Sequence, residues 1–542
     1  MTPLQATPAS GTSPTTEVLN QPIPPKDRDF WTTDPALRAA IDRHGGDATA
    51  LAAYGGEAGR ACWRDAARAA NRNAPELVTH DRGGRRCDTV LFHPAYHDLM
   101  QLGLGAGYAA GPWTGGSHVT HAAMVYLHTQ LEPGTCCPMT MTYAALPVLA
   151  AAPDLDALWR PRLTARAYDP APCPVAGKSA ATLGMAMTEK QGGSDLRSNS
   201  TIALPDGDGY RLTGHKWFCS APMSDGFLTL AQAPGGLTCF LAPRWRDGSA
   251  NAIHLMRLKD KLGNRANASA EIEYHGALAH KIGDEGAGVR TIIEMVHHTR
   301  LDTAMAPAGL MRAALAEAAW WCAGRSAFQR RLIDQPLMRR VLADLALDLE
   351  GALALGMFAA ATFDGQDDRT RALSRVTVAL AKFLSNKRCP NLVYEAMEVL
   401  GGMGYVEDTP MPLLYREAPL NSIWEGSGNV ICLDTLRTLA RVPLAAEALA
   451  GELQAAIGVD RRYDAALAAH RDRWPGMPSE EDARWFCDSL ARLLTASVLI
   501  RHAPGAVADG WCATRLDAAR GLVSGAVTGL DEAALIDRIA PA

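Results

Sequence analysis

The sequence predicts an α+β protein in which helices, a β-domain, a second set of helices and a helical tail follow one another. Helical periodicity begins at Asp34-Pro35, gives way to apolar–polar alternation between about 181 and 290, and returns after Gly288. A chain of 542 residues has room for three or four domains. We therefore expect an N-terminal arm, an N-terminal helical domain, a β-domain, a helical bundle and a C-terminal helical extension, which we assign to residues 1–30, 31–180, 181–290, 291–440 and 441–542.

The first two regions differ in composition. Residues 1–30 are rich in Pro, Thr and Ser, which is typical of a flexible arm. Asp34 can then cap a helix, and Pro35 suits its first position. Gly and Pro interrupt the sequence repeatedly up to about residue 180, so we expect several short helices there.

The β-domain and the helices after it have clearer signals. Asp206-Gly207-Asp208-Gly209 between alternating segments predicts a tight hairpin. Long amphipathic patterns follow, the second of them starting at Asp334 and Pro336, and lengths of this kind indicate a helical bundle. The tail carries a further apolar helical stripe through Phe486, Leu490 and Leu494.

Composition excludes several classes of protein. With 53 Lys+Arg against 58 Asp+Glu the net charge is −5, which excludes a uniformly basic nucleic-acid binder but leaves room for a local basic patch. The 12 cysteines are scattered without C-x-x-C spacing, so we expect neither a disulfide framework nor a metal site. The N-terminus has no signal-peptide pattern and no apolar run reaches membrane-spanning length, so we expect a cytoplasmic protein.

The first motif with chemical content is Met187-Thr188-Glu189-Lys190-Gln191-Gly192-Gly193-Ser194-Asp195, at the entry to the β-domain. Paired glycines in a turn present backbone N–H groups, and the neighbouring hydroxyls add donors and acceptors. This combination suits a phosphate-bearing or heteroaromatic cofactor. On turn chemistry alone, an ordinary helix-to-strand turn is the simpler interpretation.

Two more motifs lie further along the chain. In the segment GHKWFCS, Trp217, Phe218 and Ser220 can wall a planar ring, although a β-core can also hold such aromatics. In the segment IWEGSGN, Glu425 stands between an aromatic residue and a Gly/Ser loop. A partly desolvated Glu can serve as a general base near neutral pH, whereas a lone Glu in a loop is more often solvated.

Together these motifs resemble the acyl-CoA dehydrogenase superfamily of flavoproteins over about residues 80–440. TEKQGGSD is similar to its Thr-Glu-Pro-x-x-Gly-Ser-Asp segment, GHKWFCSA to Gly-x-Lys-x-Trp-Ile-(Thr/Ser)-Asn, and IWEGSGNV to Ile-(Tyr/Phe)-Glu-Gly-Thr-x-Gln-Ile. Arg325-Ser326-Ala327-Phe328 with Gln335 is similar to its Arg-x-x-Phe-Gly…Gln flavin-binding stretch. The resemblance implies FAD as the cofactor and an acyl-CoA dehydrogenase-like fold: an N-terminal helical domain, a central β-barrel and a four-helix bundle, here followed by an extra helical domain.

The resemblance also implies roles for residues of this chain. Glu425 would remove the proton α to a thioester carbonyl while the β carbon delivers hydride to flavin N5, and the Glu425 backbone N–H would help to stabilise the enolate. Arg325 and Gln335 would reach the FAD of a neighbouring subunit. The residues implied to bind FAD are Met187, Thr188, Gly193, Ser194, Trp217, Phe218, Ser220, Arg325, Gln335, Trp424, Gly426, Ser427 and Asn429.

Two further details refine this assignment. Some members of the superfamily carry the base on the helix just before Arg300, but here His298 and Thr299 occupy those positions, which favours Glu425. Trp424 stands where Tyr or Phe is usual and would narrow the substrate channel, so the implied substrate is a short or branched acyl-CoA, similar to isovaleryl-CoA, or another small C–H acid.

The tail of about 100 residues, the Lys-Gln-Gly-Gly variant of the first motif and the segment Glu132–Tyr143 resemble the AidB branch of the superfamily. That branch belongs to the bacterial adaptive response to DNA alkylation. The resemblance implies a homotetramer with one FAD per subunit, an electron acceptor and DNA binding through the C-terminal domain.

The charge of the tail leaves the DNA-binding role open. Residues 441–542 contain 11 Arg and no Lys against 14 Asp+Glu, a net charge of −3, whereas DNA affinity depends mainly on neutralising phosphates. Arg461, Arg462, Arg471 and Arg473 can form a basic stripe, and a solvated domain that completes the oligomer explains the tail equally well. Two hypotheses follow: an acyl-CoA dehydrogenase, or a DNA-binding protective flavoprotein with weak or vestigial dehydrogenase activity.

Overall fold

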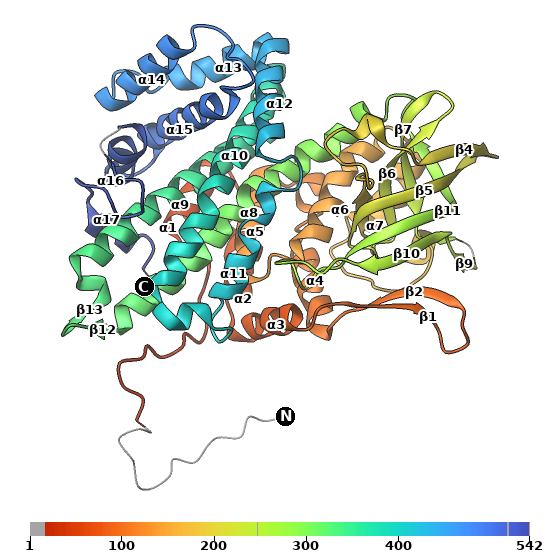
Figure 1. Cartoon of the computed structure of the whole chain (residues 1–542), viewed down its shortest axis with the longest axis horizontal. Coiled ribbons are helices and arrows are strands. Elements are labelled where there is room, and N and C mark those ends of the chain that lie inside the picture. The colour runs from red at the N-terminus through yellow and green to blue at the C-terminus, as the bar shows by residue number, and fades with distance from the viewer. Residues whose placement is uncertain (1–16, 247, 518–519, 541–542) are drawn as a thin grey trace.

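The computed structural model describes residues 17–246, 248–517 and 520–540, and it contains the predicted order of helices, sheet, bundle and helical tail (Figure 1). The Asp34 carboxylate accepts the Leu37 N–H, and Pro35 is the first residue of α1, as expected for a capped helix start. Short helices make up most of this first region: α1 (Pro35–His44), α2 (Ala48–Ala58), α3 (Ala61–Arg72), α4 (Pro94–Ala106), α5 (His118–Leu131), α6 (Cys136–Leu149) and α7 (Pro153–Leu163).

A β-hairpin interrupts the N-terminal helices, which the helical prediction for this region missed. Strand β1 (Glu76–His80) pairs with β2 (Arg86–Leu91), and the Asp81 carboxylate closes the turn by accepting the N–H groups of Gly83 and Arg85. Val90 is buried against the core of the central sheet. The strands are too short for their alternation to stand out in a region otherwise rich in helix formers.

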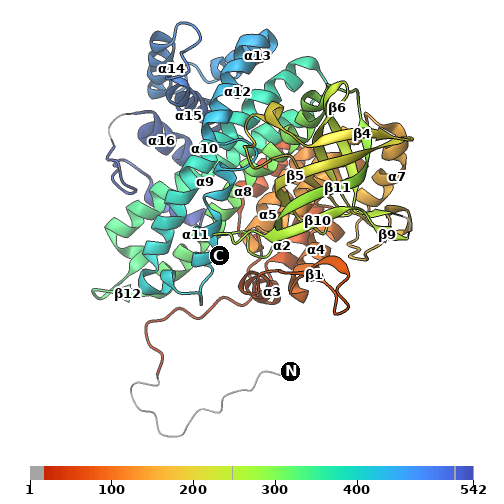
Figure 2. The ribbon, with the colours of Figure 1, turned by 45° about the vertical axis from the view of Figure 1, so that its right-hand side comes forward.

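Strands of the middle region form one seven-stranded sheet. The order is β10-β11-β5-β4-β6-β3, and β7 pairs with both β11 and β6, which closes the sheet into a barrel beside the helices (Figure 2). Asp206 pairs with Gly209, so the predicted tight hairpin is confirmed. The barrel strands are β3 (Leu183–Ala186), β4 (Ile202–Asp206), β5 (Gly209–Ser220), β6 (Gly226–Ala233), β7 (Gly236–Pro243), β10 (Ile253–Leu258) and β11 (Ser269–Ile282), and a short pair, β8 (Trp245–Arg246) with β9 (Ser249–Ala250), lies outside it.

The helical bundle is built around α8 (Gly288–Gly324), which packs against α5, α6, α9 and α10. Nearly every residue of its middle part is buried, as expected for a helix that is surrounded on all sides. A small hairpin, β12 (Ser326–Ala327) with β13 (Arg330–Arg331), follows α8. The other helices of this region are α9 (Pro336–Phe363), α10 (Asp368–Val399), α11 (Met411–Glu417) and α12 (Gly428–Arg441).

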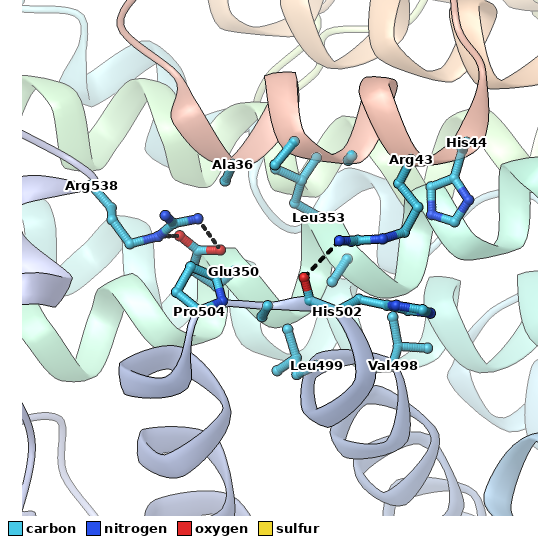
Figure 3. Close-up of a pocket in the computed structure, with 14 residues that line it drawn as sticks. Ala36, Arg43, His44, Glu350, Leu353, Val498, Leu499, His502, Pro504 and Arg538 are labelled. Carbon is cyan, nitrogen blue, oxygen red and sulfur yellow. Dashed lines mark hydrogen bonds and ion pairs between the residues drawn. The ribbon is translucent and has the colours of Figure 1, made fainter. Parts of the chain in front are cut away.

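The C-terminal extension covers one side of this bundle (Figure 1). Arg515 is buried against α9, where it forms ion pairs with Asp344 and Asp348, and Arg538 pairs with Glu350 of the same helix. A cavity of only about 40 Å³ remains where α1, α9 and α15 meet, beside the Glu350–Arg538 pair (Figure 3). The helices of the extension are α13 (Pro443–Gln454), α14 (Arg461–Arg473), α15 (Ala483–His502), α16 (Gly505–Trp511) and α17 (Glu532–Asp537).

The part of the N-terminal arm that the structure describes runs extended along the helices. The Asn20 side chain donates to the Ser326 carbonyl at 2.8 Å and accepts the Ser326 N–H at 2.7 Å, so the arm is bound to the hairpin after α8. The Arg28 N–H donates to the carbonyl of Gly59. Residues 1–16 of the predicted arm lie outside the described residues.

No helix within the described ranges is both long and apolar enough to cross a membrane.

Candidate functional site

The predicted base, Glu425, lies on the segment Asn421–Gly426, which we call the base loop. This loop begins in the short 3₁₀ turn Leu420–Ser422 and ends just before α12. The Glu425 backbone has φ +57°, in the left-handed region that non-glycine residues rarely adopt, and Gly426 follows with φ +96°. The carboxylate is partly buried, and its Oε2 accepts a hydrogen bond of 2.6 Å from the Thr299 hydroxyl. Backbone strain of this kind occurs where the surrounding contacts hold a side chain in one position.

Burial raises the pKa of Glu425, although the Thr299 hydroxyl, Lys382 and Arg300 all oppose that rise. A carboxyl group whose pKa is raised is a stronger base once it is ionised, which suits proton abstraction near neutral pH.

Thr299 lies on α8 at one of the two alternative base positions, and Arg300 follows it. Because Thr299 bonds to Glu425 directly, the two positions face the same place in the fold. The Arg300 guanidinium reaches the Glu425 carbonyl at 3.5 Å and forms an ion pair of 2.6 Å with Asp434 of α12. The base loop is therefore supported from both α8 and α12.

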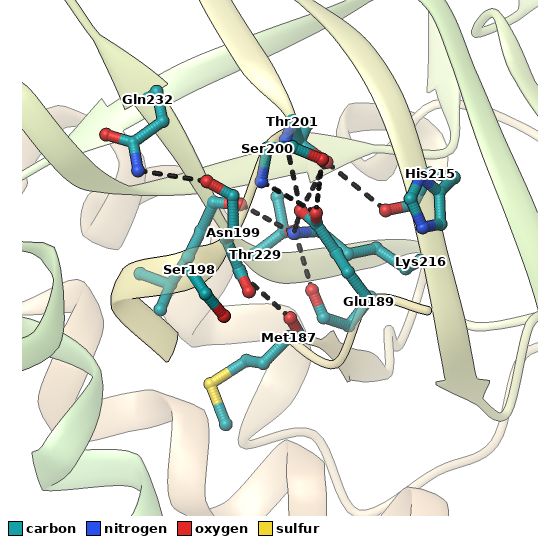
Figure 4. Close-up of polar contacts among 12 residues, drawn as sticks. Met187, Glu189, Ser198, Asn199, Ser200, Thr201, His215, Lys216, Thr229 and Gln232 are labelled. Carbon is teal, nitrogen blue, oxygen red and sulfur yellow. Dashed lines mark hydrogen bonds and ion pairs between the residues drawn. The ribbon is translucent and has the colours of Figure 1, made fainter. Parts of the chain in front are cut away.

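The motif Met187–Asp195 is joined to the GHKWFCS segment by a buried ion pair (Figure 4). Lys216 Nζ lies 2.7 Å from Glu189 Oε1, and both side chains are excluded from solvent. Glu189 also accepts hydrogen bonds from the Thr201 and Ser200 hydroxyls, and the Trp217 N–H donates to the Thr188 carbonyl at 2.7 Å. Burial favours the neutral acid, but the hydrogen bonds from Lys216 and Thr201 outweigh it and hold the pKa of Glu189 well below its ordinary value.

This pairing was missed by the sequence interpretation, which treated the two motifs only as cofactor contacts. The signal was present, since each motif contains one residue of the pair. The pair fixes the relative position of the two segments that the resemblance assigns to the flavin.

The surface beside this ion pair fits a flavin. A Cβ atom on Gly193 would lie 2.4 Å from the Thr188 hydroxyl, so only glycine permits this close turn. Trp217 is partly buried and Phe218 is 47% exposed, and Lys259 lies over one face of the Trp217 ring at 3.4 Å. An isoalloxazine with a pyrophosphate tail requires hydrogen-bond donors, which hydroxyls and turn N–H groups supply, and aromatic faces against which its ring can pack.

Cys137 of α6 is a buried residue that the sequence interpretation did not single out. Burial raises the pKa of its thiol to about 12, with Lys261 opposing that rise and the negative charge of Glu425 adding to it.

Arg325 and Gln335 lie beyond the C-terminal end of α8, away from Thr299 and Glu425. Arg325 follows the last residue of α8, and the 26 residues that separate it from Thr299 span roughly 39 Å of helix. Within the subunit, Arg325 donates to the Asn20 carbonyl at 3.0 Å and Gln335 to the Ala327 carbonyl at 2.9 Å. Phe328, between strands β12 and β13, is 96% exposed. The structure thus does not bring these two predicted residues together with the predicted base.

The remaining predicted residues lie around the start of α12. The Trp424 indole N–H donates to the Asn421 side chain at 2.6 Å, which fixes the ring. Gly426 and Ser427 lead into α12, and Asn429 in its first turn accepts a hydrogen bond of 2.9 Å from Arg484 of α15. The sequence analysis did not predict this contact between the extension and the predicted cofactor region.

The order of helices, barrel and helical bundle is that of a flavoprotein of the acyl-CoA dehydrogenase type, an oxidoreductase that depends on FAD. Three family models match the chain: the N-terminal domain of the adaptive response protein AidB at residues 20–170, the acyl-CoA dehydrogenase middle domain at 184–277 and its C-terminal domain at 286–440. The AidB protein of Escherichia coli is 43% identical over 518 residues, which cover 93% of this chain and 95% of that protein. The chain belongs to the AidB group of the acyl-CoA dehydrogenase family.

Solved structures agree with this assignment. The apo form of Bd2924 has a TM-score of 0.82 at 29% sequence identity, covering 89% of this chain and 99% of that one. Caenorhabditis elegans ACDH-11, solved in complex with C11-CoA, has a TM-score of 0.83 at 26% identity, covering 96% of this chain and 94% of that one. The helices before the barrel, the barrel and the helices after it thus recur as one fold.

Proposed function

We propose that this protein dehydrogenates a short or branched acyl-CoA, with Glu425 as the base that removes the proton α to the thioester carbonyl. The observation that carries the proposal is the environment of Glu425, which is partly buried, accepts a hydrogen bond from Thr299 and has its pKa raised by burial. FAD, when bound, accepts the hydride that leaves the β carbon.

The other residues of the chain orient the reactants. The Glu425 backbone N–H donates to the thioester carbonyl and stabilises the negative charge that develops on its oxygen. Thr188, Ser194, Trp217 and Phe218 hold the flavin against the barrel. Trp424, fixed by its bond to Asn421, narrows the acyl channel and favours small acyl groups.

The proposal is tested by mixing the FAD-loaded protein with isovaleryl-CoA under anaerobic conditions. Reduction of the bound flavin is measured as the loss of the visible absorbance of the flavin. The variant Glu425→Gln keeps the shape of the side chain but cannot accept the proton, and we expect the reduction rate to fall by about 10²- to 10⁴-fold. Glu398→Gln, on the exposed face of α10, is the matched control and should reduce at the wild-type rate. Equal rates in Glu425→Gln and wild type would refute the assignment of the base.

A chain-length series tests the substrate class. ACDH-11 was crystallised with C11-CoA, so a long acyl group is the natural competitor. We expect faster reduction with isovaleryl-CoA than with an eleven-carbon acyl-CoA, and the replacement Trp424→Phe should bring the two rates closer together. If the long acyl-CoA is faster with wild type, the small-acyl proposal is wrong.

We also propose a homotetramer in which the hairpin after α8 contacts the FAD of a neighbouring subunit. The separation between Arg325 and Thr299 and the exposure of Phe328 support this arrangement. Phe328→Ala is expected to weaken FAD retention and shift the protein toward smaller species in sedimentation analysis, because a large aromatic contact is removed.

A role in the response to DNA alkylation is the second candidate function, and the match to the AidB N-terminal domain supports it. The extension offers limited positive charge, since Arg462 pairs with Asp460 and Asp509, and Arg515 pairs with carboxylates of α9. DNA binding then depends on Arg461, Arg471 and Arg473. Retention on a DNA column at about 0.1 M salt that exceeds that of an acidic control protein, and that is lost when these three become Ala, would support this role.

A further inference from the structure

Lys382, which the sequence interpretation did not consider, is hydrogen-bonded to the base loop. Lys382 of α10 is 2% exposed, and its ammonium donates three hydrogen bonds, all to backbone carbonyls of this loop. The acceptors are the carbonyls of Asn421 at 2.8 Å, Trp424 at 3.0 Å and Gly426 at 2.9 Å. Two of these carbonyls belong to the residues immediately before and after Glu425.

This arrangement requires a charged lysine. An ammonium has three N–H donors, one for each carbonyl, whereas a neutral amine has two and turns a lone pair toward the third acceptor. No carboxylate lies within ion-pair distance of Lys382 among the residues that the structure describes. The ammonium is therefore stabilised by hydrogen bonds to the loop carbonyls and by the nearby negative charge of Glu425, and not by an ion pair with one carboxylate.

The contacts of Lys382 match the strain at Glu425. A left-handed backbone at a non-glycine residue costs free energy and persists only where neighbouring contacts hold it. Carbonyls on both sides of Glu425 accept from the same ammonium, so these contacts stabilise the left-handed backbone between them. The Thr299 hydroxyl in turn donates to the carboxylate.

We propose that the Lys382 ammonium is the positioning residue for the base: it holds the loop Asn421–Gly426 so that the Glu425 carboxylate stays hydrogen-bonded to Thr299. This inference rests on the proposed function for its catalytic meaning, but the bracing of the loop is a property of the chain that can be measured without turnover.

A pH dependence follows from this geometry. Burial lowers the pKa of Lys382 to about 7, with Glu425 of the loop opposing that shift and Arg300 of α8 and Lys387 of α10 adding to it. The protonated form holds three carbonyls, and its population falls as the pH rises through this value. The loop should therefore be most rigid below about pH 7 and loosen above it, while Glu425 also loses a neighbouring cation.

The test is hydrogen–deuterium exchange measured by mass spectrometry on the full-length, FAD-loaded protein. In Lys382→Met we expect the amides of residues 422–428 to exchange about tenfold faster or more, because the charge-assisted bonds that hold the loop are gone, while the middle of α8 is unchanged. Arg371→Met is the matched control, since this cation lies on the same helix but pairs with the exposed Asp368. Lys382→Arg should recover part of the protection.

The pH dependence of exchange in the wild-type protein is a second test, which needs no mutation. After correction for the intrinsic pH dependence of exchange, protection of residues 422–428 should fall between pH 6 and 8.5, with the change centred on the titration of Lys382. Loop protection that is independent both of pH and of the Lys382→Met replacement would overturn the proposal. If Lys382→Met does not fold, the wild-type pH series alone decides.

The catalytic consequence is read from the pH profile of flavin reduction. Lys382→Met should lose rate, and its low-pH limb should move to higher pH because a cation near Glu425 is removed. A purely structural lysine would lower the rate without moving that limb. If Glu425→Gln still reduces flavin, the proposed base is wrong while the exchange experiment still tests the bracing of the loop, so the two failures are distinguishable.

Discussion

The barrel and the bundle each contain a buried lysine close to a glutamate, and the two pairs are built in opposite ways. Lys216 bonds the Glu189 carboxylate directly at 2.7 Å, and hydroxyl and N–H donors saturate that carboxylate. Lys382 instead bonds carbonyls around Glu425, whose carboxylate receives the Thr299 hydroxyl. The pKa of Glu189 is consequently held low, whereas burial raises the pKa of Glu425.

These two environments explain why the Glu189 carboxylate has a structural role while the Glu425 carboxylate can take up a proton. A carboxylate that accepts a full set of hydrogen bonds has little tendency to take up a proton. A carboxylate with one hydroxyl donor and a cation held at a distance keeps that tendency, and the same cation fixes where the carboxylate points. The protein thus uses a lysine to immobilise Glu189 and a lysine to orient Glu425 without neutralising it.

Breaking the barrel pair should have the largest effect on stability. Glu189→Gln leaves Lys216 buried without a counter-charge, and we expect the free energy of unfolding of the barrel to fall by about 3 kcal/mol. Denaturant unfolding followed by tryptophan fluorescence measures this change. Glu273→Gln, at the exposed Glu273–His275 pair on β11, is the control and should cost less than about 1 kcal/mol. Equal losses in both variants would contradict a structural role for the buried pair.

The pH dependence of the barrel pair has a defined sign. The pKa of Glu189 in the folded protein lies below its ordinary value of 4.5, so the carboxylate is ionised in the pair above that pH, and the pair stays charged up to about pH 8, to which burial lowers the pKa of Lys216. The contribution is lost as the pH falls from 4.5 toward the lowered pKa. Unfolding curves of wild type should therefore converge with those of Glu189→Gln in strong acid, and a constant difference at every pH would disprove this linkage.

Removing the single hydroxyl donor to Glu425 should raise the pKa of the base and favour its protonated form. In Thr299→Val the carboxylate loses a hydrogen bond to its charged state, so the pKa of Glu425 rises further and the low-pH limb of flavin reduction moves to higher pH. The rate on the plateau should change little. Thr303→Val, one turn further along α8, removes a hydroxyl that bonds the Arg300 carbonyl and serves as the control. An unmoved limb in Thr299→Val would count against the contact.

The parts of the fold that the sequence predicted well are those with local causes. The hairpin at Asp206–Gly209 follows from turn residues, and the long helices after Gly288 follow from sustained periodicity. The strands β1 and β2 were missed because each is too short to show a period, and they are stabilised by contact with the barrel instead.

The site was predictable to the extent that its motifs are contiguous. Glu425 and Thr299 were singled out from separate segments, and they lie in contact. Lys382 and Arg484 were missed because each contacts a segment remote in sequence, and long-range contacts leave no local pattern. The sequence did contain one indication for Lys382. It lies in the stretch of α10 between Val378 and Asn386, which is otherwise buried, and a lysine there must find hydrogen-bond acceptors.

The smallest expected effect comes from the outer support of the base loop, and it has the opposite sign to that of Thr299→Val. Asp434 partly neutralises Arg300 through an ion pair of 2.6 Å, so Asp434→Asn leaves more positive charge beside Glu425 and lowers its pKa. The low-pH limb of flavin reduction should then move slightly to lower pH. Because Asp434 is partly exposed, the shift should shrink as salt is raised. Asp488→Asn removes a comparable pair with Arg492 on α15 and should leave the limb in place. A shift to higher pH in Asp434→Asn would mean that Arg300 acts on the backbone of the loop and not through its charge.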